Sequence, residues 1–277
     1  MPTRLEKAIF TTHPPTYSLL NRLRDRSRRL YESAADKHQR ERKTAEYLLL
    51  SLTNCGRTWL RVMLGRAMQL AYGIESVNLH DLFAFSERNP NLPSIKPMHE
   101  KYGQFGNTYQ QHKVILLVRD PRDALVSRYY QHQKILPPDL NQYVLAGEDL
   151  SAYIQFYNDW QNYQDTTQAF LCVRYEDLKR DTLEELSRVV DFLELAIPPA
   201  ILAEAIDFAA FNNMKKLEAE GSPDVRAGVL QGHRSPAQRK VRKGKVGGYR
   251  EDLSAEAIDF LDRTISRELN PIYGYSH

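Results

Sequence analysis

One stretch, residues 47–65, constrains the fold of this chain more than any other. It opens with Tyr47–Leu52, a run that is apolar except for one serine and is typical of a parallel strand covered on both faces. Asn54–Arg57 breaks the run, and from Trp59 onward apolar residues recur at helical spacing. Such a strand–turn–helix aims backbone N–H groups and the positive end of a helix dipole at one point. We predict an anion-binding turn with Thr58 as the helix cap, although an ordinary βα turn would show the same pattern.

Length and composition are those of a globular protein with a sizeable core. The chain has 277 residues, of which 42% are hydrophobic and 26% charged, and its net charge is only +3. Electrostatic binding must therefore come from local clusters of charge. The two cysteines, Cys55 and Cys172, exclude a disulfide scaffold and give no zinc-site spacing. Because no apolar run is long enough to cross a bilayer and no apolar leader is visible, we expect a cytoplasmic protein.

Residues 1–46 differ in character from the rest of the chain. Arginines are frequent between residues 21 and 43, with a few apolar positions among them. This spacing predicts a basic, weakly amphipathic helical arm that is largely solvated. Contact with an acidic surface, a nucleic acid or a partner subunit in a homodimer is the alternative. We favour the solvated arm, expect no nucleic-acid partner, and divide the chain into this arm and a domain at 47–277.

A second βα unit and a third strand follow the first unit. Lys113–Val118 is the clearest strand in the sequence, and Arg119–Asp123 leads from it into a helix that contains Ser127. Ala169–Tyr175 is a third buried strand. In open parallel sheets, ligands bind at the edge where the strands end. The turn at 54–58 and the polar residues after the second strand should therefore share one site.

A basic, glycine-containing segment lies near the end of the chain. Between residues 221 and 252, several glycines stand among mostly basic side chains, including Arg242-Lys243-Gly244. The composition predicts a mobile loop that closes over an anionic ligand, and a solvated loop without a ligand is the alternative. Together with the turn and Arg119, this segment implies a ligand with several anionic groups, such as a nucleotide with more than one phosphate.

A P-loop NTPase is one candidate class for such a ligand, but the turn does not fit it. The Walker pattern requires two glycines and a lysine followed by Ser or Thr, whereas the turn at 54–58 has one glycine and no lysine. The strand at 113–118 ends in Arg119, although Asp120 follows. We therefore expect a ligand held by side-chain cations without a metal, and we keep a P-loop kinase as the least favoured alternative.

Five motifs in order resemble the sulfotransferase family, whose donor is 3′-phosphoadenosine-5′-phosphosulfate (PAPS) and whose product is 3′-phosphoadenosine-5′-phosphate (PAP). They are Thr53–Trp59, Arg119–Asp123 with Ser127, Arg174–Leu178, Ala210–Met214 and Arg242–Gly247. Each motif is weak alone, and their common order over residues 47–252 carries the resemblance. It implies an α/β fold with three layers, α/β/α, around a central parallel sheet.

The resemblance also implies where the donor binds. The implied contacts are Asn54, Cys55, Gly56, Arg57, Thr58 and Trp59 for the 5′-phosphosulfate, Arg119, Ser127, Arg242, Lys243 and Gly244 for the 3′-phosphate, and Tyr175 and Phe211 for the adenosine. Arginines suit these positions because a guanidinium forms paired, charge-assisted hydrogen bonds with a phosphate. Trp59 and Phe211 offer aromatic faces for the purine.

In the family, a histidine just after the strand that precedes 113–118 commonly acts as the general base. His99 is the natural candidate here, because a base must take the proton of the acceptor's hydroxyl or amine. The family spacing Lys-x-His is replaced by Lys96 and His99 three residues apart. His80 and Glu100 are the reserve candidates.

The largest departure from the family is Asn54, where Lys or Arg usually contacts the oxygen that gains charge as sulfate leaves. Asparagine carries no charge, and one lost donor in such a site typically costs about 100- to 1000-fold in rate. Arg57 or Lys96 is therefore expected to replace it. If neither does, the chain is a slow enzyme or a non-catalytic protein.

These observations predict a metal-independent sulfotransferase that moves a sulfuryl group from PAPS to a hydroxyl or amine. The aromatic segments at 80–85 and 153–160 favour a small-molecule acceptor, such as a natural product, over a large glycan. Because of Asn54, a non-catalytic nucleotide-binding or regulatory protein of the same fold is the second hypothesis.

Overall fold

The computed structural model of the chain describes residues 33–75, 77–104, 108–132, 135–137, 139–220, 225, 239 and 241–275. The chain divides into two compact units after Thr44. In the first unit the structure describes residues 33–44, which include helix α2 (Ala34–Thr44) with basic side chains in its last turn. The rest of the predicted basic arm lies outside the described residues, so the arm at 1–46 and its homodimer contact stay predictions.

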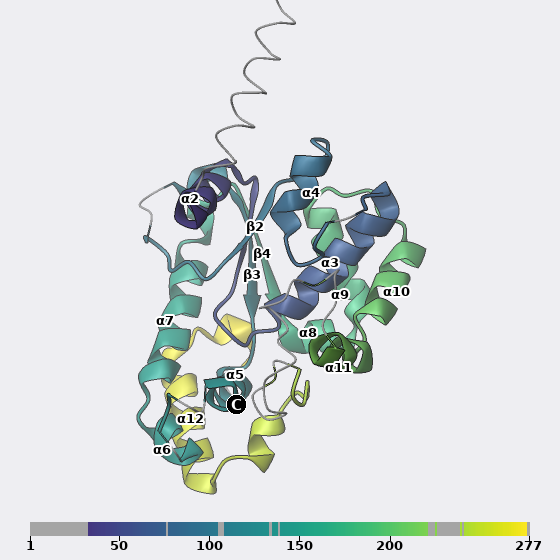
Figure 1. The fold of residues 1–277 in the computed structure, drawn as a ribbon. Coiled ribbons are helices and arrows are strands. Elements are labelled where there is room, and N and C mark those ends of the chain that lie inside the picture. Colours follow the sequence, from purple (N-terminus) through teal and green to yellow (C-terminus); the bar gives the residue numbers. More distant parts are fainter. Residues whose placement is uncertain are drawn as a thin grey trace, which may run out of the picture. The chain divides into compact units, whose positions relative to one another are not determined.

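The second unit contains, within the described residues, a four-stranded parallel sheet (Figure 1). In spatial order its strands are β2 (Ile95–Met98), β1 (Tyr47–Leu50), β3 (Lys113–Val118) and β4 (Ala169–Arg174). All neighbouring pairs are parallel, and Leu50 lies opposite Met98 on one side and Leu116 on the other. The strands therefore end at one common edge of the sheet, as the sequence predicted.

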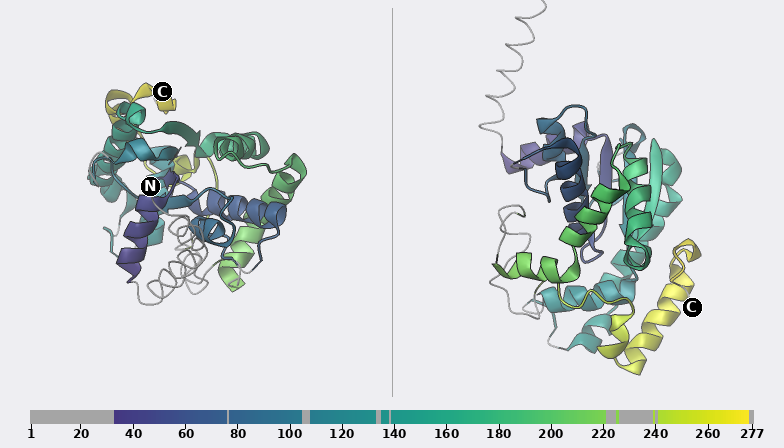
Figure 2. Two further views of the ribbon diagram at one scale, coloured as in Figure 1. Left: turned by 90° about the horizontal axis from the view of Figure 1, so that it is seen from above. Right: turned by 90° about the vertical axis from the view of Figure 1, so that its right-hand side faces the viewer.

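Helices cover both faces of this sheet and confirm the predicted α/β fold. The helices are α3 (Arg57–Tyr72), α4 (Leu82–Arg88), α5 (Pro121–His132), α6 (Leu140–Leu145), α7 (Glu148–Asn162), α8 (Tyr175–Arg180), α9 (Thr182–Phe192), α10 (Pro199–Phe208), α11 (Phe211–Glu220) and α12 (Ala255–Glu268). Figure 1 shows α7 on one face, and α3, α9 and α10 on the other, while α12 packs against α6 and α7. Both views in Figure 2 place α12, in yellow, away from the green helices α10 and α11.

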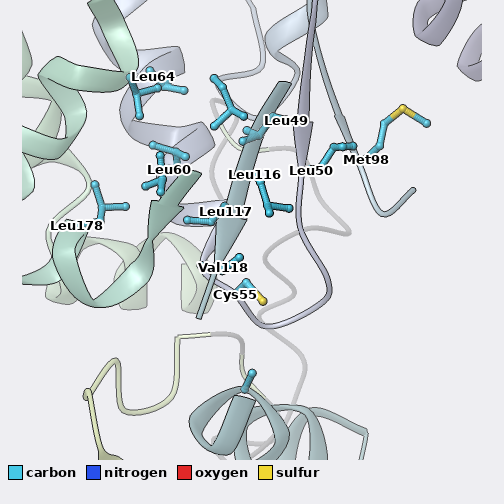
Figure 3. Packing of buried hydrophobic residues seen from close by; sticks show 14 of the residues in the cluster. Leu49, Leu50, Cys55, Leu60, Leu64, Met98, Leu116, Leu117, Val118 and Leu178 are labelled. Atoms are coloured by element: carbon cyan, nitrogen blue, oxygen red, sulfur yellow. The ribbon is translucent and has the colours of Figure 1, made fainter. Parts of the chain in front are cut away.

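The core lies between the sheet and these helices, and it buries the strand before the turn at 54–57 and one side of the helix after it. Every residue of Tyr47–Leu50 is fully buried, as are Leu60 and Leu64 of α3. Figure 3 shows these two α3 leucines on the same side of the sheet as Leu49. Burial of one such side chain contributes about 1.5–3 kcal/mol. Among the described residues, no helix combines the length and apolar character that crossing a bilayer requires.

Candidate functional site

A cavity of about 370 Å³ lies at the edge where the strands end. Its wall contains members of all five motifs, namely Asn54, Gly56, Arg57, Thr58, Trp59, Arg119, Ser127, Tyr175, Phe211, Arg242, Lys243 and Gly244. His99 and His80 also line it. Among the described residues predicted for the site, Cys55, Lys96 and Glu100 are not part of this wall.

The turn after β1 leaves the start of α3 open to the cavity. Asn54 and Gly56 both have left-handed backbone conformations, with φ of 64° and 91°. Gly56 packs so closely on Tyr175 that a Cβ atom would lie 2.5 Å from the ring. Helix α3 begins at Arg57 with Gly56 as its N-cap and no side-chain cap, so the prediction that Thr58 caps the helix is wrong. Backbone N–H groups at an uncapped helix start can bind an anion.

The side chain of Asn54 fastens the turn to α5. Its Nδ2 donates hydrogen bonds to Ser127 Oγ at 3.1 Å and to Gln131 Oε1 at 2.8 Å. The Asn54 carbonyl oxygen accepts a hydrogen bond from Arg119 Nη1 at 3.1 Å. Both amide hydrogens of Asn54 are therefore donated within the protein. They connect the motif at 53–59 directly to the motif that contains Arg119 and Ser127.

Arg119 is held at the end of β3 with part of its guanidinium unused. Its Nη2 donates to the Lys245 carbonyl oxygen at 3.4 Å, and its Cζ lies 4.5 Å from the centroid of the Tyr175 ring. The Tyr157 hydroxyl accepts a hydrogen bond from the Arg119 backbone N–H at 3.0 Å. In the described part of the chain, the buried Arg119 Nε has no hydrogen-bond partner. The cation is thus fixed in place and keeps a free donor.

Two buried carboxylates anchor the described end of the predicted basic loop. Asp123 on α5 accepts hydrogen bonds from the backbone N–H groups of Gly247 and Tyr249, at 2.7 and 3.0 Å. Burial raises the pKa of Asp123. Glu218 on α11 accepts one from the Val241 N–H at 3.0 Å. These contacts place residues 241–251 at the cavity, whereas most of the preceding loop lies outside the described residues.

The cations of this segment are paired with neighbouring carboxylates. Lys243 Nζ lies 3.0 Å from an Asp252 oxygen and 3.3 Å from one of Glu251. Arg242 lies 3.5 Å from Asp252, and its guanidinium covers the Tyr130 ring at 4.2 Å. A phosphate at this place would therefore share these cations with Asp252.

Aromatic rings form the wall on the side of α3 and α11. Trp59 Nε1 donates to the Ala209 carbonyl oxygen at 2.9 Å, and Lys179 Nζ lies 5.2 Å from the Trp59 ring. Gly244, with φ of 59°, packs on Phe211 so closely that a Cβ atom would lie 2.8 Å from its ring. Only a residue without a side chain lets this segment approach the Phe211 ring.

His99 and Arg57 form a pair at the β2 end of the cavity. His99 Nδ1 lies 2.6 Å from the Ser51 carbonyl oxygen, which can only accept a hydrogen bond. The neutral ring therefore carries its proton on Nδ1, and Nε2 accepts a hydrogen bond from Arg57 Nη2. Arg57 Nη1 donates to the Met98 carbonyl oxygen. Burial lowers the pKa of Arg57 to about 10.

Sequence reasoning missed several residues of the wall, of which Arg61 and Gln131 are the most informative. Arg61 lies one helical turn after Arg57, and Gln131 one turn after Ser127. The i, i+4 spacing within each helix was the available signal, because such residues share one helix face.

Comparisons with known proteins agree with this arrangement. Residues 45–272 match the family model described as "Sulfotransferase domain". Cytosolic sulfotransferase 12 of Arabidopsis thaliana is 23% identical over 266 residues, which covers 82% of this chain and 78% of that protein. Among solved structures, mouse SULT7A1 complexed with PAP has a TM-score of 0.60 at 19% identity, covering 81% of this chain and 84% of that one. Retinol dehydratase in complex with retinol and PAP has a TM-score of 0.61 at 16% identity, covering 80% of each chain. These two structures share the fold, and because the family model spans most of the sequence, this chain belongs to the sulfotransferase family.

Proposed function

We propose that this chain transfers a sulfuryl group from PAPS to a hydroxyl or amine of a small-molecule acceptor in the cytoplasm. The observation that carries the proposal is the cavity itself, because residues from five separate motifs line it. Membership of the family supports sulfuryl transfer as the reaction. The structural neighbours named above hold PAP, which supports PAPS as the donor, and a relative named as cytosolic supports the compartment.

The donor set of the cavity fits a nucleotide with phosphates at both ends. Arg119 keeps an unused buried Nε, and Ser127 lies one helical turn after Asp123 on α5. We assign the 3′-phosphate to these two residues with Arg242 and Lys243. We assign the 5′-phosphosulfate to the uncapped start of α3 and the turn before it, and the adenine to the rings of Trp59 and Phe211.

The order of the strands sets the direction of the donor along the cavity. At the ends of β2, β1 and β3 stand His99, the turn at 54–57 and Arg119, in that order. With the 3′-phosphate at Arg119, the sulfuryl end of the donor points toward β2. The acceptor then enters beside His99, opposite the leaving phosphate, as an in-line displacement requires.

His99 is proposed as the general base. Its Nδ1–H donates to the Ser51 carbonyl oxygen, so Nε2 is the nitrogen whose lone pair accepts hydrogen bonds. An acceptor hydroxyl takes the place of Arg57 at Nε2 and gives up its proton there as the sulfuryl group transfers. The Ser51 carbonyl holds the ring in the required tautomer and stabilises the imidazolium that forms.

Arg57 is proposed as the cation that replaces the family lysine. Asn54 donates both amide hydrogens to α5, and Lys96 is not in the cavity wall among the described residues. Arg57, by contrast, lines the cavity beside His99. Its guanidinium neutralises the negative charge that develops on the 5′-phosphate oxygen as the sulfuryl group departs from it.

A small-molecule acceptor is supported by a structural neighbour. Retinol dehydratase, a structural neighbour, binds retinol together with PAP. The acceptor is therefore assigned to compounds of drug-like size with one reactive hydroxyl or amine.

Radiolabelled PAPS incubated with the full chain and a broad panel of small alcohols, phenols and amines tests this function. We expect label to move to at least one acceptor without added Mg²⁺, and PAP to inhibit the transfer. Tight PAP binding with no labelled product from any acceptor would support the non-catalytic alternative instead. Transfer of phosphate from ATP that requires Mg²⁺ would support the kinase alternative.

A further inference from the structure

The β2 end of the cavity carries more positive charge than the donor needs. Arg57 and Arg61 lie one turn apart on α3, and both line the cavity. Arg57 donates to the Met98 carbonyl oxygen at the end of β2, and Arg61 Nη2 donates to the His80 carbonyl oxygen in the loop before α4. The two guanidinium groups thus lie one helical turn apart along the cavity wall, and that of Arg57 contacts His99.

Neither cation has a carboxylate partner in the part of the chain that the structure describes. Arg61 Nε is buried there without a hydrogen-bond partner. Burial first, and then the charge of Arg57, lower the pKa of Arg61 to about 9, while Asp81 offsets only part of this effect. Burying an unpaired cation costs free energy unless an anion accompanies it. The pair is therefore suited to a ligand that brings negative charge.

A donor bound as proposed brings negative charge to Arg57 but not to Arg61. Its 3′-phosphate lies at Arg119, and its phosphosulfate lies at the turn, where Arg57 serves the leaving oxygen. Arg61 lies one turn further along α3 and is joined to the loop before α4, a helix that packs against β2. In the proposed donor pose, the part of the cavity that Arg61 and His99 line is left for the acceptor.

We propose that the acceptor carries a carboxylate close to the hydroxyl that is sulfated, and that Arg61 binds this carboxylate and selects acidic acceptors. The assignment rests on the proposed function, since it takes the direction of the donor from it. A guanidinium has five N–H groups, so one that is fixed on a protein carbonyl leaves others to donate to a carboxylate oxygen.

The test measures binding of matched acids and esters to the PAP-loaded protein by calorimetry. The probes are 4-hydroxybenzoate, 4-hydroxyphenylacetate and 3-(4-hydroxyphenyl)propanoate, each with its methyl ester. For at least one pair we expect the acid to bind roughly 10- to 100-fold more tightly than the ester, the range for a hydrogen bond to a charged group. In Arg61→Met this ratio should fall to about one, and Arg61→Lys should restore part of it.

Arg66→Met is the matched control, because Arg66 lies on the same helix outside the cavity wall and pairs with Gln69 and Glu204. It should keep the wild-type ratio of acid to ester binding. The proposal is overturned if no acid binds the wild-type protein more tightly than its ester, or if Arg61→Met keeps the preference. A titration with PAP alone separates this failure from failure of the proposed function, which predicts PAP binding whatever the acceptor.

Discussion

Asn54 and Arg57 are the two residues on which the proposed replacement of the family lysine rests. At the position where the sulfotransferase motif has a cation, Asn54 uses its amide to join the turn to Ser127 and Gln131. Three residues later, Arg57 brings a guanidinium to the same cavity and contacts His99. In the proposed site, Asn54 joins the turn to α5 and Arg57 supplies the positive charge, so the two roles reside on separate side chains.

Removing the charge of Arg57 should reduce turnover more than donor binding. For Arg57→Met we expect kcat to fall by about 100- to 1000-fold, the loss typical of one donor to a developing oxyanion. Arg57→Lys should lose less, because it keeps a cation near the leaving oxygen. Steady-state kinetics with a calorimetric PAP titration separates the two effects. Full kcat in Arg57→Met would show that the cation at this end has no catalytic role.

His99 is expected to act in the chemical step. In His99→Ala, kcat should fall by about 100- to 10,000-fold, as loss of a general base predicts, while PAP affinity stays close to wild type. His112 is a matched control, because its Nδ1 also lies on a backbone carbonyl, that of Ala45 at 2.7 Å, but it is buried outside the cavity wall. His112→Ala should lower the free energy of unfolding and leave kcat per folded molecule unchanged. Normal turnover in His99→Ala would refute the assignment.

At the scale of elements, the segment at 241–251 is positioned by backbone hydrogen bonds to side chains of other elements. Asp123 and Glu218 hold it at both ends, and Gly244 rests on the Phe211 ring between them. The cations of the segment reach the cavity only because the backbone is fixed in this way. Its order is therefore a property of α5 and α11 as much as of its own sequence.

Gly244→Ala should disturb this packing, and Gly73→Ala provides the control. Both glycines are left-handed, with φ of 59° and 62°, but only at Gly244 would a Cβ atom meet a ring, that of Phe211 at 2.8 Å. The backbone change alone costs about 1–2 kcal/mol in each variant. We expect Gly244→Ala also to weaken PAP binding by at least tenfold, measured by calorimetry, and Gly73→Ala not to. Equal PAP affinity in the two variants would argue against a role for Phe211.

The strands that could be predicted are those with long apolar runs. β1, β3 and β4 are visible in this way. Arg119 could be predicted as a site residue because it comes directly after β3. The apolar pattern alone did not identify β2 as a strand, because Lys96 and Pro97 interrupt it, which an edge strand tolerates. β4 ends at Arg174, one residue earlier than predicted, so that Tyr175 begins α8.

Motif order predicted most of the cavity wall, but it could not show which atoms face inward. Cys55 belongs to the motif, yet its side chain is buried under the turn, where its Sγ lies 3.3 Å from the Tyr157 hydroxyl. Lys96 lies only three residues before His99, so its position outside the cavity wall could not be inferred from the sequence. The partners of Asn54 and Arg61 depend on tertiary contacts, which a single sequence does not reveal.

At the level of the whole chain, a half-buried carboxylate connects the C-terminal residues to the end of β3. Glu176 accepts hydrogen bonds from the Asp120 N–H at 3.0 Å and from the Tyr275 hydroxyl at 2.6 Å. Burial nevertheless raises the pKa of Glu176 above its ordinary value. Folding therefore makes this carboxyl bind its proton more tightly.

The free energy of unfolding should report this shift. Because the folded state holds the Glu176 proton more tightly than the unfolded state, lowering the pH from 7 through the raised pKa should stabilise the wild type relative to Glu176→Gln. Glu194 gives the opposite case, since its hydrogen bond to Lys113 lowers its pKa. The wild type should lose its advantage over Glu194→Gln as the pH falls. Urea unfolding at pH 7, 5.5 and 4.5 measures both differences, and a change of the same sign in the two variants would contradict the account.

In the proposed function, this cavity binds the nucleotide of PAPS with its 3′-phosphate on Arg119. Calorimetric titration of PAP into the wild type, Arg119→Ala and Arg267→Ala tests it most directly, because Arg267 is exposed and pairs only with Glu268 among the described residues. We expect one PAP site in the wild type and in Arg267→Ala, and an affinity roughly 10- to 100-fold weaker in Arg119→Ala. No PAP binding to the wild type, or equal affinity in all three proteins, would contradict the claim.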